Sequence, residues 1–339
     1  MRTGLMIVLV TLAVAGMVHE ALAAGVNPPP GFASSFEKAL AEAKKDNKPL
    51  YVHFTTDWCG WCRRIEKEVY ASEKGKEALS GFVAVSLDCS EKAPDVKTNE
   101  ALLDKYGGGG YPFIVILAPD GTVLDSFSYM AVDEFVKRVN GVREKFERRN
   151  KFLEKAKAGD HPNDLAFQLE ALEVFASTQE WDKVDAAARR VLTLDKERAH
   201  TVKAKFAQLQ VAAAQKNART LDNLVLEIRR LDPDNKGHSL EAALEHQAEL
   251  AMDKVTTKTF EVQYKRAHTI LVQRAALKNL RDPLSAKVDL GIFQAKWGKF
   301  NDARTTLQKL LTDNPNHPSA ASIKNLIEQI NKIEAQTKK

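Results

Sequence analysis

Residues 35–145 alternate short, almost wholly apolar runs with amphipathic stretches, a pattern typical of strands separated by helices. The predicted strands are Leu50–Phe54, Phe82–Leu87, Phe113–Leu117 and Thr122–Phe127. A first helix is predicted to start at Ser35. Three further helices are predicted over Cys62–Tyr70, Ala101–Tyr106 and Val132–Val142. Pro119-Asp120-Gly121 predicts a hairpin turn, because proline presets φ and glycine accepts a positive φ. The order β-α-β-α-β-β-α predicts an α/β fold with a mixed central sheet and helices on both faces.

Beyond residue 145 strand patterns largely disappear and amphipathic helices follow one another. They are predicted over Glu144–Lys157, Leu165–Thr178, Trp181–Leu194, His200–Lys216, Leu221–Leu231, Leu240–Leu250, Thr259–Arg281, Ser285–Trp297, Asn301–Thr312 and Ala320–Glu334. The short connections predict antiparallel helical hairpins. The apolar spacing Phe300-x2-Ala303-x3-Leu307 resembles the second helix of a tetratricopeptide repeat, and similar spacing starts at Trp181. Because the motifs recur irregularly, we expect an all-α, degenerate tetratricopeptide-like domain over residues 146–339.

The N-terminal residues have the pattern of a secretory signal. Arg2 precedes an apolar stretch, Leu5–Val18, and Ala21-Leu22-Ala23 forms an A-x-A cleavage site. The sequence therefore predicts a signal peptide over residues 1–23 and a Pro-rich linker over 24–34. A mature protein in the bacterial periplasm is the favoured interpretation. An uncleaved signal that anchors the protein to the membrane is the alternative.

The number and distribution of charged residues argue against one class of function, nucleic-acid binding. The chain has 50 basic and 45 acidic residues in 339, for a formal net charge of +5. These charges are interleaved and form no long block of one sign, so nucleic-acid binding is not indicated. A hydrophobic content of 44% is enough to build the cores of the two domains that the length suggests.

Cys59 and Cys62 form a C-x-x-C pair just after the first predicted strand. If the first cysteine opens a helix, the helix dipole lowers its pKa, and the pair can perform thiol–disulfide exchange. A c-type haem site would need histidine at position 63, which is Arg63. A zinc site would need four ligands, and only Cys89 remains among the cysteines. A structural disulfide stays open, and Cys89 is either a buried small hydrophobe or a thiol free for an intermolecular bond.

Several motifs occur together in an order that resembles the thioredoxin-like family, closest to its exported branch with a W-C-x-W-C signature. They are Phe54-Thr55-Thr56-Asp57-Trp58-Cys59-Gly60-Trp61-Cys62, Val85-Ser86-Leu87-Asp88, Tyr111-Pro112 and Pro119-Asp120-Gly121. The resemblance covers about residues 35–145 and implies an α/β thioredoxin fold. It implies that Cys59 is the exposed attacking thiol, that Cys62 is the buried resolving thiol, and that Trp58 shields the site.

The same resemblance implies a substrate-binding surface. Pro112 matches the family's cis-proline, which lies against the disulfide, and an ordinary turn proline is the alternative for this residue. Trp58, Trp61, Tyr111 and Pro112 are the expected substrate-binding residues. Tyr129 falls where the family often has glycine beside the substrate groove, so the substrate fit is expected to differ. No metal and no cofactor are expected.

His53 occupies the strand position where ordinary thioredoxins bury an acid beneath the cysteines. A histidine there could accept the proton of Cys62, because its pKa ordinarily lies near working pH. Hydrogen-bonded packing in the core is the alternative. The dipeptide Gly60-Trp61 matches neither the reductase nor the oxidant members of the family, so the direction of electron flow stays open.

The sequence thus predicts an exported protein thiol–disulfide oxidoreductase. Its expected partners are protein substrates with cysteines, and a membrane thiol-transfer protein would exchange electrons with it. Stacked helix pairs suit protein binding, so the helical domain is expected either to recruit substrate or a partner, or to be plain packing. A redox-linked chaperone or assembly scaffold is the alternative function. The oligomeric state is not predicted.

Overall fold

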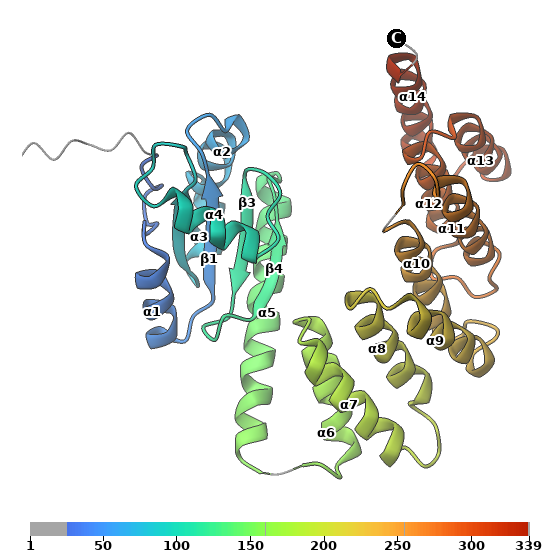
Figure 1. The fold of residues 1–339 in the computed structure, drawn as a ribbon, viewed down its shortest axis with the longest axis horizontal. Helices are drawn as coiled ribbons and strands as arrows, with labels where there is room; N and C mark the ends of the chain where they lie inside the picture. Colours follow the sequence, from blue (N-terminus) through green and yellow to red (C-terminus); the bar gives the residue numbers. More distant parts are fainter. Residues whose placement is uncertain (1–25, 160, 254, 338–339) are drawn as a thin grey trace, which may run out of the picture. The chain divides into compact units, whose positions relative to one another are not determined.

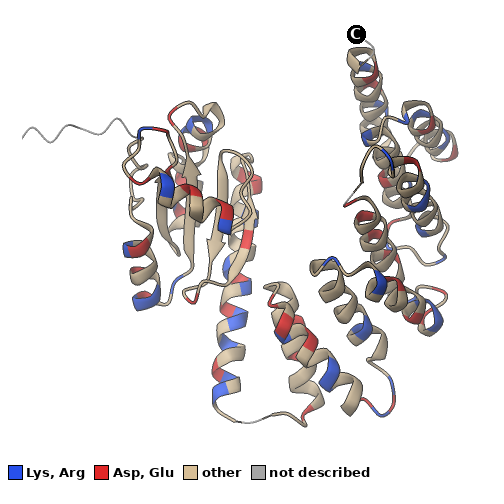
Figure 2. Ribbon diagram, in the orientation of Figure 1, with Lys and Arg blue, Asp and Glu red and all other residues tan. Residues whose placement is uncertain are grey.

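The computed structural model describes residues 26–159, 161–253 and 255–337 and divides into two compact units, Met1–Arg143 and Glu144–Lys339. The expected signal peptide, residues 1–23, and the first residues of the expected linker lie outside the described residues. No helix in the described ranges is long and apolar enough to cross a membrane. Lys and Arg are interspersed with Asp and Glu along the helices of each unit (Figure 2).

The first unit is built around a four-stranded mixed sheet (Figure 1). Its strands are β1 (Leu50–Thr55), β2 (Val83–Asp88), β3 (Phe113–Leu117) and β4 (Val123–Phe127), in the order β2-β1-β3-β4. β1 pairs in parallel with β2 and antiparallel with β3, which pairs antiparallel with β4. The predicted α/β thioredoxin fold and its four strands are therefore confirmed.

Helices cover both faces of this sheet. They are α1 (Phe36–Asp46), α2 (Gly60–Ile65), the π-helix η1 (Glu66–Tyr70), α3 (Glu73–Leu79), α4 (Val96–Lys105) and α5 (Val132–Lys157). α1 and α4 contribute Phe36 and Leu103 to a core with Val52 of β1 on one face. On the other face Tyr51 of β1 packs edge-on against Phe135 of α5, at 6.1 Å between ring centroids. Because both faces are covered, every residue of β1 is buried, which explains why apolar residues predominate in this strand.

The segment expected to be a linker packs against the sheet where it is described. Ala33 forms a parallel bridge with Val85 of β2, and the ring of Phe32 lies 4.9 Å from that of Tyr70. The backbone N–H of Val26 donates to the carboxylate of Asp88 (2.6 Å). Residues 26–34 thus pack as part of the first unit, through the side chains of Phe32 and Ala33 and the backbone of Val26.

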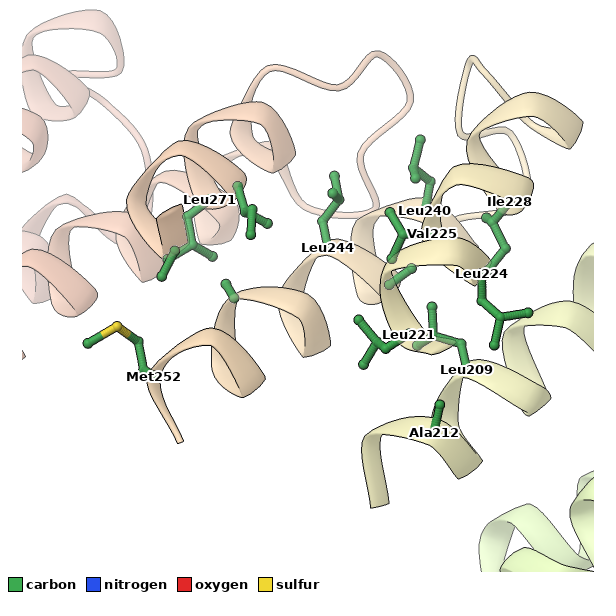
Figure 3. Close-up of a cluster of buried hydrophobic side chains, with 14 of the residues drawn as sticks. Leu209, Ala212, Leu221, Leu224, Val225, Ile228, Leu240, Leu244, Met252 and Leu271 are labelled. Carbon is green, nitrogen blue, oxygen red and sulfur yellow. The ribbon is translucent and has the colours of Figure 1, made fainter. Parts of the chain in front are cut away.

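The second unit is all-helical. Beyond the end of α5 it contains α6 (Leu165–Ser177), α7 (Trp181–Leu194), α8 (Thr201–Ala214), α9 (Ala218–Leu231), α10 (Ser239–Met252), α11 (Phe260–Ala275), α12 (Pro283–Lys296), α13 (Phe300–Asp313) and α14 (Ala320–Thr337). Consecutive helices pack as hairpins, α6 with α7, α10 with α11 and α12 with α13. A central cluster joins Leu209 of α8, Leu221 of α9 and Leu244 of α10 (Figure 3). The predicted run of helices is confirmed.

Candidate functional site

The cysteine pair lies at the junction between β1 and α2. β1 ends at Thr55, and Cys59 is the N-cap residue of α2, so the helix dipole points its positive end at this cysteine. Cys59 and Cys62 form a disulfide with their Cα atoms 5.2 Å apart. The backbone N–H of Cys62 donates to Sγ of Cys59 (3.1 Å). After reduction the same N–H and dipole would stabilise a thiolate on Cys59, which favours the attacking role predicted for this cysteine.

The two cysteines do not differ in exposure as expected. Cys59 is 4% exposed and Cys62 is 1% exposed, so both are buried in the disulfide form. The solvent-exposed surface beside them belongs to the tryptophans instead, with Trp58 69% exposed and Trp61 52% exposed. Large apolar side chains are costly to leave in water and are typical of contact surfaces.

The structure brings the expected proline loop next to the cysteine loop. The Tyr111–Pro112 peptide bond is cis, as the resemblance implied. Tyr111 packs edge-on against Trp58, with 5.7 Å between the ring centroids. The hydroxyl of Ser128 donates to the carbonyl of Pro112 (2.8 Å), which ties the loop to the end of β4. Trp58, Tyr111 and Pro112 therefore belong to one site.

Trp61 belongs to a second aromatic pair, with Tyr129 at 5.0 Å between ring centroids. The guanidinium of Arg64 lies 5.2 Å from each of these two rings. Glu68 accepts two hydrogen bonds from Arg64 (2.9 and 3.0 Å) and one from the hydroxyl of Tyr129 (2.7 Å). These contacts hold Trp61 and Tyr129 in place at the protein surface. Arg64 and Glu68 were missed in the sequence, where the only available signal is their i, i+4 spacing.

His53 is fully buried on β1 and pairs in register with Ser86 of β2. Its Nδ1 lies 3.3 Å from the hydroxyl of Ser86, and Nε2 has no partner among the described residues. Burial lowers the pKa of His53 to about 3. The expected role as proton acceptor required a pKa near working pH, and that requirement is not met. His53 is a neutral imidazole at neutral pH.

His53 makes acid stability testable. The unfolded chain protonates this histidine near its ordinary pKa of 6.5, whereas the folded chain stays neutral down to about pH 3. Protons therefore favour the unfolded state, and stability falls as pH drops from 6.5 towards 3. We expect the melting temperature measured by calorimetry to decrease less between pH 7 and pH 4.5 in His53→Phe than in the wild type. His317→Ala, at an exposed histidine, is the control, and an identical pH dependence in wild type and His53→Phe would contradict this assignment.

Cys89 is free and buried just beyond β2. Its backbone N–H donates to the carbonyl of Thr55 (2.8 Å), which places it one strand away from the cysteine loop. Burial raises the pKa of the Cys89 thiol to about 11. A thiol that stays protonated and covered is a poor nucleophile, so the structure favours the buried small hydrophobe over an intermolecular bond. Within the described ranges no group of three or more His, Cys, Asp or Glu side chains could hold a metal ion.

The family model that matches this chain lies within the first unit. A family model described as thioredoxin-like matches residues 32–119. The thiol:disulfide interchange protein DsbD 1 of Pseudomonas aeruginosa is 32% identical over 88 residues, which are 26% of this chain and 14% of that protein. The human spermatogenesis-associated protein 20 is 30% identical over 106 residues, which are 30% of this chain and 13% of that protein. The chain thus matches only about one seventh of the length of these relatives.

Similar solved structures cover about a third of the chain. The oxidised C-terminal domain of DsbD from Neisseria meningitidis is 20% identical with a TM-score of 0.29, and the match covers 32% of this chain and 97% of that domain. A putative disulphide-isomerase from Bacteroides thetaiotaomicron is 29% identical with a TM-score of 0.28, covering 35% of this chain and 98% of that one. The Cys59–Cys62 disulfide lies within the residues that the thioredoxin-like family model matches. Residues 32–119 are thus similar to thioredoxin-like domains, and they contain the C-x-x-C pair of Cys59 and Cys62.

Proposed function

We propose that this protein is an exported thiol–disulfide oxidoreductase that acts on protein disulfides or thiols. The observation that carries the proposal is the Cys59–Cys62 disulfide at the N-terminus of α2, flanked by the exposed side chains of Trp58 and Trp61. The helix terminus activates one sulfur, and the aromatic rings offer a contact surface for a polypeptide. A disulfide that serves stability alone needs neither feature.

The exchange proceeds in two balanced steps. In the reducing direction the Cys59 thiolate attacks one sulfur of a substrate disulfide, forms a mixed disulfide and expels the other substrate sulfur as a thiolate. Cys62, once deprotonated, then attacks Sγ of Cys59 and releases the second substrate thiolate. Two electrons pass from the pair to the substrate, and the Cys59–Cys62 disulfide forms. Oxidation of a substrate dithiol follows the same steps in reverse.

Substrate contact falls to the two aromatic pairs. Trp58 with Tyr111 lies on the side of the cis-proline loop, and Trp61 with Tyr129 lies on the side of Arg64 and Glu68. Each pair presents a ring face or edge that can cover apolar side chains of a bound polypeptide. Pro112 follows Tyr111 directly, and its carbonyl accepts the hydrogen bond from Ser128. His53 is assigned to packing rather than to proton transfer, because burial lowers its pKa to about 3 and makes it a weak proton acceptor.

Export places this chemistry in an oxidising compartment. The N-terminal pattern of Arg2, Leu5–Val18 and Ala21-Leu22-Ala23 supports a bacterial periplasmic location. There the pair needs a dedicated electron partner, and a membrane thiol-transfer protein has the matching chemistry. The likeness to a thiol:disulfide interchange protein supports such a partner. The helical unit recruits the substrate or partner, and a scaffold role without turnover is disfavoured because it has no need of both cysteines.

Alkylation of thiols in intact cells tests this proposal. We expect the Cys59–Cys62 pair to become alkylated after dithiothreitol and to be protected after diamide, and its state without treatment gives the direction of electron flow. The double variant Cys59→Ser/Cys62→Ser keeps Cys89 and therefore measures how much of the alkylation occurs at Cys89. A pair that stays oxidised under both treatments would be a structural disulfide and would contradict the proposal.

A further inference from the structure

The second unit has a groove on α9, α10 and α11 that the redox chemistry does not use. It has a volume of about 580 Å³ and is lined by residues of α9 and α11 and by Gln247 of α10. Its floor includes Val225 and Ile270, which are buried members of the central cluster that Figure 3 shows in part. Because both helices are anchored on this cluster, the walls of the groove are parts of packed secondary structure rather than loops.

Two aliphatic side chains on these walls remain in solvent. Leu226 on α9 is 53% exposed and Val262 on α11 is 70% exposed. Each lies in the lining of the same groove, one from each wall. Paired exposed aliphatic residues beside an apolar floor are typical of a surface that a partner covers, whereas isolated ones need no explanation.

The polar lining is basic. Arg229, Lys265 and Arg266 line the groove, and none of its described lining residues is Asp or Glu. Arg266 is paired with Asp222 (2.6 Å), and Arg229 donates to the neutral amide of Gln273 (3.1 Å). No carboxylate within the described ranges forms an ion pair with Lys265 or Arg229. Arg229 and Lys265 thus have no paired carboxylate among the described residues.

We propose that this groove binds an acidic, amphipathic segment of a protein partner, with aliphatic side chains on one face and Asp or Glu beside them. Aliphatic side chains of the segment would cover Leu226 and Val262, and its carboxylates would pair with Arg229 and Lys265. Complementary charge supplies register and selects against basic segments. The proposal deepens the recruiting role given above to the helical unit and rests on it for its purpose.

Fluorescence anisotropy with the full chain tests the groove. The probe is a labelled amphipathic peptide with leucine at every third or fourth position and glutamate elsewhere, and the comparison peptide has lysine at every glutamate position. We expect only the glutamate peptide to bind, with an affinity that falls as salt rises. Arg229→Glu/Lys265→Glu should weaken it by about tenfold or more, and Leu226→Ser/Val262→Ser should weaken it by a similar factor.

Matched variants separate the groove from general surface effects. Lys309→Glu/Lys324→Glu makes the same change in net charge on exposed lysines of α13 and α14, and Ile292→Ser/Ile333→Ser removes two other exposed aliphatic side chains. Both should bind the peptide as the wild type does. Equal binding of the two peptides, absence of binding, or equal losses in groove and matched variants would overturn the proposal. Binding to phosphatidylglycerol vesicles without binding to the peptide would also overturn it, in favour of a membrane surface.

The redox proposal and the groove proposal can be tested independently of each other. Groove variants should keep the wild-type rate of disulfide exchange with a small disulfide, because their side chains belong to the second unit. Cys59→Ser should keep the wild-type affinity for the glutamate peptide. Loss of peptide binding with intact exchange therefore addresses the groove alone, and loss of exchange with intact peptide binding addresses the cysteine pair alone.

Discussion

Replacing Cys59 with serine is expected to reduce catalysed exchange with a protein disulfide to the background rate. The physical reason is that Cys59 is the sulfur at the N-terminus of α2 that accepts the N–H of Cys62, so it is the sulfur whose thiolate the helix stabilises. A serine hydroxyl cannot form the mixed disulfide. Reduction of insulin, followed by turbidity, measures the effect.

The third cysteine supplies the control for this variant. Cys89 is buried and its thiol stays protonated, so Cys89→Ser is expected to leave exchange within about twofold of the wild type. Circular dichroism of both variants shows whether the fold is kept. Exchange by Cys59→Ser near the wild-type rate, or a large loss in Cys89→Ser with an intact fold, would contradict the assignment of the nucleophile.

Replacing Arg149 with methionine is expected to destabilise the second unit by about 3–5 kcal/mol. Arg149 and Glu180 form a bidentate ion pair at 2.7 and 3.1 Å, with side chains only 3% and 8% exposed. Removing one partner leaves the other charge buried and only partly compensated, by Lys183 and Thr178. Calorimetric unfolding of the full chain measures the loss.

The neighbouring Arg148 provides a matched substitution on the surface. Its ion pair with Glu173 is about half exposed, so Arg148→Met should cost less than about 1 kcal/mol. Burial opposes ionisation of Glu180, yet its hydrogen bonds from Arg149, Lys183 and Thr178 hold its pKa below the ordinary 4.5. Its contribution is therefore present above about pH 4.5 and lost as pH falls through the lowered pKa. Equal costs for Arg148→Met and Arg149→Met would contradict the buried pair.

Local patterns predicted the first unit well because each element has its own signal. The four strands are short apolar runs, and the hairpin turn places Gly121 at φ +89, where glycine is favoured. α3 was missed because it has seven residues and contains Gly75, a poor helix former. The structure explains this glycine, since a Cβ there would lie 2.0 Å from the carbonyl oxygen of Val69. This close approach depends on the tertiary structure, so the periodicity of the sequence does not indicate it.

The long helix α5 also shows a limit of prediction from local sequence patterns. Two helices were expected, ending and restarting near residue 143, and the structure has one continuous helix, Val132–Lys157. Gly141 lies inside it, and a glycine in a helix interior costs only about 1 kcal/mol relative to alanine. Buried residues on either side, Phe135 and Phe152, offset such a cost through packing. Propensity alone could not decide between one helix and two.

The candidate site was predictable in its chemistry and less so in its environment. The C-x-x-C spacing and the Tyr111-Pro112 dipeptide identified the two loops that the structure brings together through Trp58 and Tyr111. The burial of Cys59, the lowered pKa of His53 and the contacts of Arg64 with Trp61 and Tyr129 depend on residues that are distant in sequence or on full enclosure by the fold. The pattern of a single sequence shows neither the contacts between distant residues nor how completely the fold buries a side chain.

Trapping with Cys62→Ser tests the central claim most directly. Without the resolving thiol, a mixed disulfide at Cys59 cannot be released by the second step, so partner proteins accumulate on the chain. We predict reducible adducts in cells that express Cys62→Ser, mapped by mass spectrometry to Cys59 and absent from Cys59→Ser/Cys62→Ser. Adducts no more abundant than in the double variant, or adducts mapped to Cys89, would contradict a thiol–disulfide oxidoreductase acting through Cys59 and Cys62.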